Sequence, residues 1–200
     1  MEATANRTLS NDKAQRIVDA MRSSVARRGV AGSTFDHVAR EAGVSRGLLH
    51  YYFGTKERLL TEVVRRDAEL KMAALEHDLA GAQTADDVIA LLVSSLEHMV
   101  ADDPEFVAVG FELFTLAQRN PEIAAEYTEL QASLRAHISG VLAAKHEQGV
   151  LHLAAAPDAV VDVLLSLADG LSARMLVEPD RDHGDTIAAG VTAVRALVRS

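Results

Sequence analysis

The sequence predicts an all-α protein in two parts, a short N-terminal part of three helices followed by a longer helical body. Apolar residues recur at helical spacing along almost the whole chain, and Gly, Pro and Asp residues divide this pattern into about nine helices. The apolar run that most resembles a strand, residues 150–154, has five residues and is expected to be a connector. A mostly helical chain of 200 residues that is 48% hydrophobic can bury a sizeable core.

The first helix is expected at residues 13–28. Its apolar residues form a single stripe, as an amphipathic helix packed on one side requires. The stripe consists of Ala14, Ile17, Val18, Met21 and Val25. The residues before it, 1–9, contain no apolar run and are expected to form a flexible tail.

The segment from Thr34 to Lys56 predicts two short helices joined by a tight turn. Gly43 ends the first helix where a left-handed residue is needed, and Ser45 can cap the next one. Residues 43–45 leave three positions for the turn, which suits a helix-turn-helix. The small Ala39 permits the close, steep crossing of the two helices. The second helix is expected to bury Leu48, Leu49 and Tyr52.

The opposite face of this second helix carries hydrogen-bond donors and a glycine, which has no side chain, instead of the Glu and Lys residues typical of a solvated helix. It consists of Ser45, Arg46, Gly47, His50 and Tyr51. Serine and arginine at a helix start can reach phosphates or base edges, and glycine allows close approach of the backbone. The face therefore predicts contact with DNA.

The charge distribution favours the same interpretation. The whole chain has a net charge of −9, but residues 1–66 alone carry 12 Lys and Arg against 7 Asp and Glu. The remaining residues carry 8 against 22. A basic N-terminal part attached to an acidic body is typical of a nucleic-acid-binding domain joined to a domain of another function.

Together with YYFGTKERLL at 51–60, these motifs resemble the TetR family of one-component transcriptional regulators over about residues 10–65. The resemblance implies a DNA-binding domain at 10–56 and a ligand-sensing and dimerisation domain at 57–200. It implies DNA contacts by Thr34, Ser45, Arg46, Gly47, His50, Tyr51 and Lys56. The chain departs from the family pattern at His50, where tyrosine is frequent, and at Tyr52, where histidine is frequent.

The later helices are expected at residues 56–79, 85–100, 105–118, 121–149, 157–178 and 185–199. The helix at 157–178 is apolar on nearly all sides, so it must be buried on all sides. The simplest hypothesis is that a partner subunit covers the apolar surface of this helix. The alternative is that the helix lies at the centre of the core of a monomer. The predicted homodimer interface consists of Leu164, Leu167, Leu171, Met175, Val191 and Val194. A dimer would also place two recognition helices on a palindromic operator.

The resemblance further implies a small-molecule inducer held among the helices of the body. The candidate ligand-binding residues are Met72, His98, Met99, Phe106, Phe111, Glu112, Phe114 and Tyr127. The alternative is that these side chains are ordinary packing. His98 and Glu112 stand within apolar runs, and a buried polar group at such a position needs a partner, which a ligand could supply.

Other function classes lack their sequence signals. The chain has no cysteine, no HExxH, GxSxG or GxxxxGK motif, and its eight histidines are scattered. We expect no metal, no cofactor and no membrane partner, and the location is expected to be cytoplasmic. The sequence thus predicts a ligand-responsive dimeric regulator, most often a repressor in this family. A DNA-binding regulator controlled by a protein partner is the alternative, and a small all-helical enzyme is a remote one.

Overall fold

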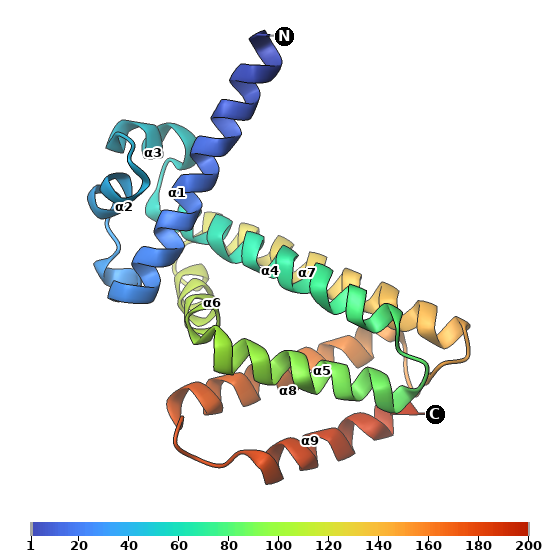
Figure 1. Ribbon diagram of the computed structural model, residues 1–200. Helices are drawn as coiled ribbons and strands as arrows, with labels where there is room; N and C mark the ends of the chain where they lie inside the picture. Colours follow the sequence, from blue (N-terminus) through green and yellow to red (C-terminus); the bar gives the residue numbers. More distant parts are fainter. Residues whose placement is uncertain (1, 200) are drawn as a thin grey trace. The chain divides into compact units, whose positions relative to one another are not determined.

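The computed structural model describes residues 2–199, with side chains described from Asp12 onward. The backbone is helical from Glu2, whereas the sequence predicted a flexible tail at residues 1–9 and a first helix from residue 13. The chain forms two compact units. The first unit comprises Met1–Asp67 and Val109–Tyr127, and the second comprises Ala68–Ala108 and Thr128–Ser200. Each unit is built almost entirely of helices, which confirms the predicted fold class (Figure 1).

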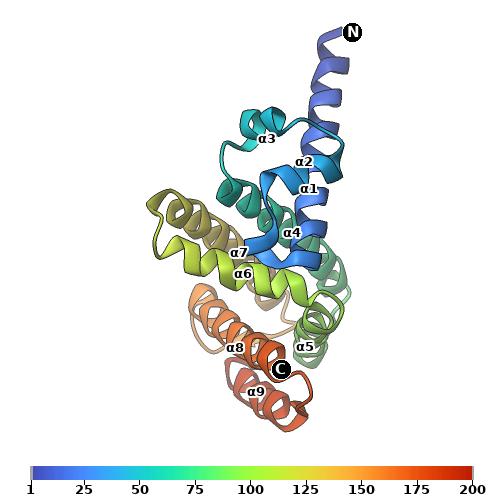
Figure 2. The same cartoon turned by 90° about the vertical axis from the view of Figure 1, so that its left-hand side faces the viewer.

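The first unit packs the N-terminal helices with a segment that returns from the middle of the chain (Figure 2). Its helices are α1 (Glu2–Gly32), α2 (Phe35–Ala42), α3 (Arg46–Phe53), the start of α4 (Lys56–Ala80), most of α6 (Pro104–Ala117) and the start of α7 (Pro121–Glu147). Its fully buried side chains include Ile17, Met21, Val38, Leu49, Leu59, Leu113 and Ile123. The predicted apolar stripe of the first helix, centred on Ile17 and Met21, thus faces this core.

A break interrupts α1 at Gly29, whose φ of 68° and ψ of 171° lie in a region that only glycine adopts readily. The Ser33 hydroxyl donates to the Gly29 carbonyl at 2.8 Å, and Ser33 is itself fully buried. The regular helix therefore ends next to Arg28, the end that the sequence predicted, and the last residues of α1 turn the chain toward α2.

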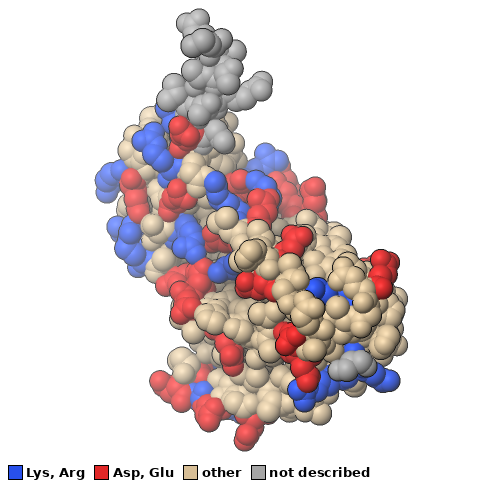
Figure 3. All heavy atoms as spheres, turned by 45° about the vertical axis from the view of Figure 1, so that its right-hand side comes forward, with Lys and Arg blue, Asp and Glu red and all other residues tan. Residues whose placement is uncertain are grey.

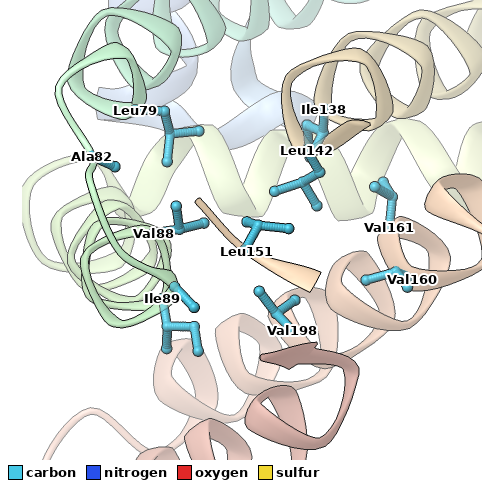
Figure 4. Packing of buried hydrophobic residues seen from close by; sticks show 11 residues of the cluster. Leu79, Ala82, Val88, Ile89, Ile138, Leu142, Leu151, Val160, Val161 and Val198 are labelled. Carbon is cyan, nitrogen blue, oxygen red and sulfur yellow. The ribbon is translucent and has the colours of Figure 1, made fainter. Parts of the chain in front are cut away.

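The second unit contains α5 (Ala85–Asp102), α8 (Pro157–Val177) and α9 (Gly184–Leu197) together with the remaining parts of α4, α6 and α7. Helix α5 packs against both α8 and α9, which lie side by side (Figures 1 and 2). Leu79, Val88, Leu142, Leu151, Val160 and Val161 point toward one another at the centre of this unit (Figure 4).

Two short strands correct the prediction for residues 150–154 and for the end of the last helix. Strand β1 (His152–Leu153) pairs in antiparallel fashion with β2 (Val198–Arg199). Val198 of β2 and Leu151, the residue directly before β1, belong to the core and are 1% and 0% exposed. The two strands are far apart in sequence, so local periodicity could not reveal the pairing.

Capping residues fix the helix ends of the second unit. Thr84 and Asp87 form a capping box at the start of α5, because Asp87 N donates to the Thr84 hydroxyl and Thr84 N donates to the Asp87 carboxylate. The hydrogen bond from Gln83 N, followed by that of Thr84, lowers the pKa of Asp87. At the end of α4, the buried Lys145 ammonium donates to the carbonyls of Ala80 and Ala82. Within residues 2–199, no helix is both long enough and apolar enough to cross a membrane.

Candidate DNA-binding site

Helices α2 and α3 form the predicted helix-turn-helix. Helix α2 ends at Ala42 and α3 begins at Arg46, which leaves the three-residue turn that the sequence predicted. Gly43 has a φ of 65° and a ψ of 37°, the left-handed conformation required there. Its N–H group donates to the Arg40 carbonyl, so the turn also satisfies the end of α2.

Side chains cap the first turns of these helices. The Thr34 hydroxyl accepts from His37 N at 3.3 Å, and the Ser45 hydroxyl accepts from Leu48 N at 3.3 Å. At the start of α4 the Thr55 hydroxyl accepts from Arg58 N. Because each hydroxyl accepts one bond in this role, its own hydrogen is still available as a donor to a phosphate oxygen.

The buried face of α3 is narrower than the sequence predicted. Leu49 is fully buried, whereas Leu48 and Tyr52 are only half-buried. Tyr52 contacts the ring of Tyr51 edge to face, with centroids 5.3 Å apart. Since α3 has only eight residues, a single leucine and the neighbouring rings hold it against the unit.

The exposed face of α3 carries the side chains predicted to meet DNA. Tyr51 is 80% exposed, and a Cβ atom at Gly47 would meet nothing closer than the Ser45 hydroxyl at 3.9 Å. Arg46 is exposed and lies 3.4 Å from the Asp36 carboxylate. An exposed pair at this distance contributes little, so the guanidinium can exchange Asp36 for a phosphate or a guanine edge.

His50 is exposed, and two contacts orient its ring. The ring lies edge to face with Phe35 at a centroid distance of 4.8 Å, and Nδ1 is 2.9 Å from the Gly54 carbonyl. A carbonyl oxygen can only accept, so Nδ1 carries the hydrogen of this bond. Nε2 is then the ring nitrogen available to DNA.

Lys56 is half-buried and holds the corner between α1 and α2. Its ammonium donates to the Val30 carbonyl at 2.5 Å, and the same carbonyl accepts from Ser33 N at 3.2 Å. The sequence did not indicate this structural role, because the acceptor is a backbone atom 26 residues away. An ammonium has three N–H donors, so a DNA contact by Lys56 stays a compatible prediction.

Lys and Arg side chains gather over the first unit's N-terminal helices on the face shown in Figure 3, with Asp and Glu among them. Some of the arginines are paired within the unit. Arg22 lies 2.7 Å from Asp67, and Arg27 lies 2.5 Å from Glu41.

One arginine of the first unit connects two distant segments. Arg58, in the first turn of α4, pairs with Glu122 and with Glu126, the latter at 3.4 Å. These pairs help to explain why Val109–Tyr127 belongs to the first unit. The only sequence signal was the presence of two acidic residues, four positions apart, at the start of the helix at 121–149.

The candidate ligand-binding residues are divided between the two units. Phe111, Glu112, Phe114 and Tyr127 belong to the first unit, whereas Met72, His98, Met99 and Phe106 belong to the second. Within the first unit, the rings of Phe114 and Tyr127 lie 6.2 Å apart. Within the second, the Phe106 ring faces the Lys71 ammonium.

Two of these residues correct the expectation of buried polar groups. Glu112 and His98 are both exposed, and His98 Nδ1 contacts the Ser94 carbonyl of its own helix at 2.6 Å. Apolar neighbours in sequence occupy the other faces of a helix, so they do not bury a polar residue by themselves. Among side chains from Asp12 onward, no group of three or more His, Asp or Glu is arranged to hold a metal ion.

The residues predicted at a dimer interface are all half-buried. They are Leu164, Leu167, Leu171, Met175, Val191 and Val194. Leu164, Val191 and Val194 also pack on the core of their own chain. The apolar surface of α8 is only partly covered within one chain, since Val163 is 43% exposed and Val177 is 79% exposed.

Comparison with protein families assigns the chain. Residues 17–63 match the model of bacterial regulatory proteins of the tetR family, and residues 86–199 match that of the C-terminal part of BetI-type transcriptional repressors. The chain therefore belongs to the TetR family of DNA-binding transcriptional regulators.

Individual relatives agree with this assignment. The HTH-type transcriptional regulator BetI of Rhizobium meliloti is 36% identical over 110 residues, 54% of this chain and 53% of the relative. BetI of Agrobacterium fabrum is 32% identical over 110 residues, 53% of this chain and 52% of the relative. The chain thus spans about half the length of these curated relatives.

Solved structures share the fold. A putative transcriptional regulator from Saccharomonospora viridis in complex with choline has a TM-score of 0.73 and 22% identity, covering 95% of this chain and 100% of that one. FadR from Bacillus subtilis in complex with stearoyl-CoA has a TM-score of 0.70 and 20% identity, covering 90% and 94%.

Proposed function

We propose that this protein is a dimeric repressor that binds a palindromic operator through α2 and α3 and leaves it when a small molecule binds. The observation that carries the DNA-binding part is the exposed face of α3. It combines the arginine Arg46, the open backbone at Gly47 and the exposed ring of Tyr51 beside a tight turn. This is the composition that a major groove accepts.

The proposed dimer rests on the half-covered apolar surface of α8 and α9. In α9 no residue is buried, although the helix carries Ile187, Val191, Val194 and Leu197. Two copies of these helices would form a four-helix interface with two-fold symmetry. Each chain presents one recognition helix, so pairing is also what a palindromic operator requires.

The proposed inducer is a small organic molecule bound in the helical body. The ligand complexes of two solved structures that share the fold support a ligand-binding body. Choline and stearoyl-CoA, the ligands of two structural neighbours, define two chemical classes to test. The candidate ligand-binding residues named from the sequence remain proposals.

The DNA-binding proposal is tested with operator sequences selected from random duplexes and measured by fluorescence anisotropy. Arg46→Ala is expected to lower operator affinity by roughly 1–3 kcal/mol and to relax the preference at one base pair. Arg181→Ala, which removes the same charge from an exposed position of the second unit outside α8 and α9, is the matched control. Equal operator affinity and equal base preference in the two variants would contradict the proposal that the exposed face of α3 binds DNA.

The dimer proposal is tested by sedimentation at micromolar concentration. The wild-type chain is expected to be a dimer, and Leu167→Glu is expected to give monomer or aggregate and to lose operator binding. Ala144→Glu adds the same charge at an exposed position of α7 and should leave the dimer intact. A monomeric wild-type chain would contradict both the proposed dimer interface and the proposed binding to a palindromic operator.

The inducer proposal is tested by thermal denaturation with choline, stearoyl-CoA and a wider set of metabolites. A compound that raises the melting temperature by binding the body should also weaken operator binding, because the coupling of two sites is reciprocal. Stabilising compounds that never change operator affinity would favour the alternative, a regulator controlled by a protein partner.

A further inference from the structure

Lys71 of α4 makes two contacts that together resemble the binding of a cation. Its ammonium lies 4.9 Å from the centroid of the Phe106 ring and 3.0 Å from Asp103 Oδ2. All three residues belong to the second unit. The Asp103 side chain is only 15% exposed, so its charge is shielded from solvent more than a surface carboxylate is.

Hydrogen bonds that do not involve Lys71 join Asp103 to the backbone of Phe106. Asp103 is the residue between α5 and α6, and both its carbonyl and its Oδ1 accept from Phe106 N, at 3.1 and 3.3 Å. Pro104 stands at the start of α6 and restricts the backbone between them. These backbone contacts keep Asp103 and Phe106 adjacent without any contribution from Lys71.

The segment that contains Asp103 and Phe106 is acidic. Residues 72–108 include eight Asp and Glu and no Lys or Arg. Two of these acids have distant partners within the second unit, since Glu76 lies near His137 and Asp86 lies near Arg195. Asp103 has the Lys71 ammonium as its ion-pair partner.

We propose that Asp103 and Phe106 form a subsite for organic ammonium ions, and that the Lys71 ammonium occupies this subsite when no ligand is bound. An aromatic face beside a carboxylate is the chemistry that recognises alkylated ammonium groups. The proposal deepens the proposed ligand response and rests on it for its regulatory meaning. A bound ligand displaces Lys71, and because Lys71 lies on α4, the helix that begins at Lys56, occupancy of the subsite acts directly on α4.

The tethered ammonium lowers the apparent affinity for a free ligand. If Lys71 occupies the subsite about nine-tenths of the time, removing it should strengthen ligand binding ~10-fold. Lys71→Met removes the ammonium and keeps an apolar stem of similar length. Lys71→Arg keeps a cation that can stack on the ring, so it should show no such gain.

The experiment titrates tetramethylammonium and choline into the full chain by calorimetry, at constant ionic strength set with NaCl. Lys71→Met is expected to bind about tenfold more tightly than the wild type, and Lys13→Met, on α1, is the matched control with unchanged affinity. Phe106→Leu or Asp103→Asn, added to Lys71→Met, should abolish the gain. The carbon isostere of choline, in which a tert-butyl group replaces the trimethylammonium group, should not bind.

Three results would overturn the subsite: Lys71→Met with wild-type ammonium affinity, a gain that persists without the Phe106 ring, or equal binding of the neutral isostere. Circular dichroism and sedimentation verify that each variant is folded, and Lys71→Gln replaces Lys71→Met if the latter is not. The titration contains no DNA, so its outcome is separate from that of the operator measurements. Ammonium binding without operator release would refute the ligand response and leave the subsite standing.

Discussion

Replacing Lys56 by methionine separates a structural contact from a DNA contact at the same side chain. The substitution keeps the apolar stem and removes the ammonium that donates to the Val30 carbonyl. Hydrogen bonds to charged groups contribute roughly 1.5–3 kcal/mol. The lower end applies here, because Lys56 is half-buried and the Val30 carbonyl still accepts from Ser33 N.

We therefore expect Lys56→Met to lower the free energy of unfolding by about 1.5 kcal/mol. For a chain of 200 residues this corresponds to a fall in melting temperature of about 3–6 °C. Chemical denaturation in urea gives the free energy, and its m-value shows whether the folded state has the same compactness. Lys13→Met, at an exposed position of α1, is the control and should change little.

The same variant reports on DNA. Operator affinity falls as the salt concentration rises, with a negative slope on logarithmic axes. If Lys56 also neutralises one phosphate, this slope is smaller in magnitude by about 0.9 in Lys56→Met than in the wild type. Stability equal to that of the wild type would refute the contact with Val30. An unchanged salt slope together with reduced stability would assign Lys56 to the corner between α1 and α2 alone.

The remaining predictions concern stability. Gly43→Ala should lower the free energy of unfolding by roughly 1–2 kcal/mol through its left-handed backbone alone, since a Cβ atom there would meet nothing within 4 Å. Gly29→Ala should lower the free energy of unfolding by a larger amount, because residues other than glycine rarely adopt the φ and ψ angles of Gly29. Leu142→Ala removes a fully buried side chain and should lower it by about 2–5 kcal/mol in urea denaturation. Desolvation raises the pKa of the Asp169 carboxyl above 3.8. The resulting loss of stability is absent below pH 3.8, grows as the pH rises from 3.8 to the raised pKa, and is complete above it. Asp169→Asn should therefore stabilise the protein at neutral pH and have little effect below pH 3.8, as measured by unfolding curves over a series of pH values. Destabilisation at neutral pH would instead indicate that the carboxylate has a cationic partner.

Local signals predicted the helix-turn-helix well. Gly43 and Ser45 act within three residues of their own positions, so the sequence could indicate the turn and the cap without any tertiary information. The same applies to Thr84, whose capping box involves Asp87 three positions later. The composition of the exposed face of α3 was also readable, because the buried face of a short amphipathic helix defines the opposite one.

Contacts between distant segments could not be predicted in this way. The pairing of β1 with β2 and the ion pairs of Arg58 each join parts of the chain far apart in sequence. Helical periodicity gives the spacing of side chains but does not decide which face packs. For this reason Glu112, within an apolar run, was expected to be buried and is exposed.

The returning segment Val109–Tyr127 has a consequence for protein engineering. A chimeric sensor joined after Asp67 would transplant the helix-turn-helix without the segment that supplies Val109, Leu113 and Ile123, which are 5%, 1% and 1% exposed. The graft would leave apolar surface of the N-terminal helices uncovered and remove the acidic partners of Arg58. The helix-turn-helix of this protein therefore cannot be transferred as one continuous segment. A functional chimera has to include both stretches of the first unit, residues 1–67 and 109–127.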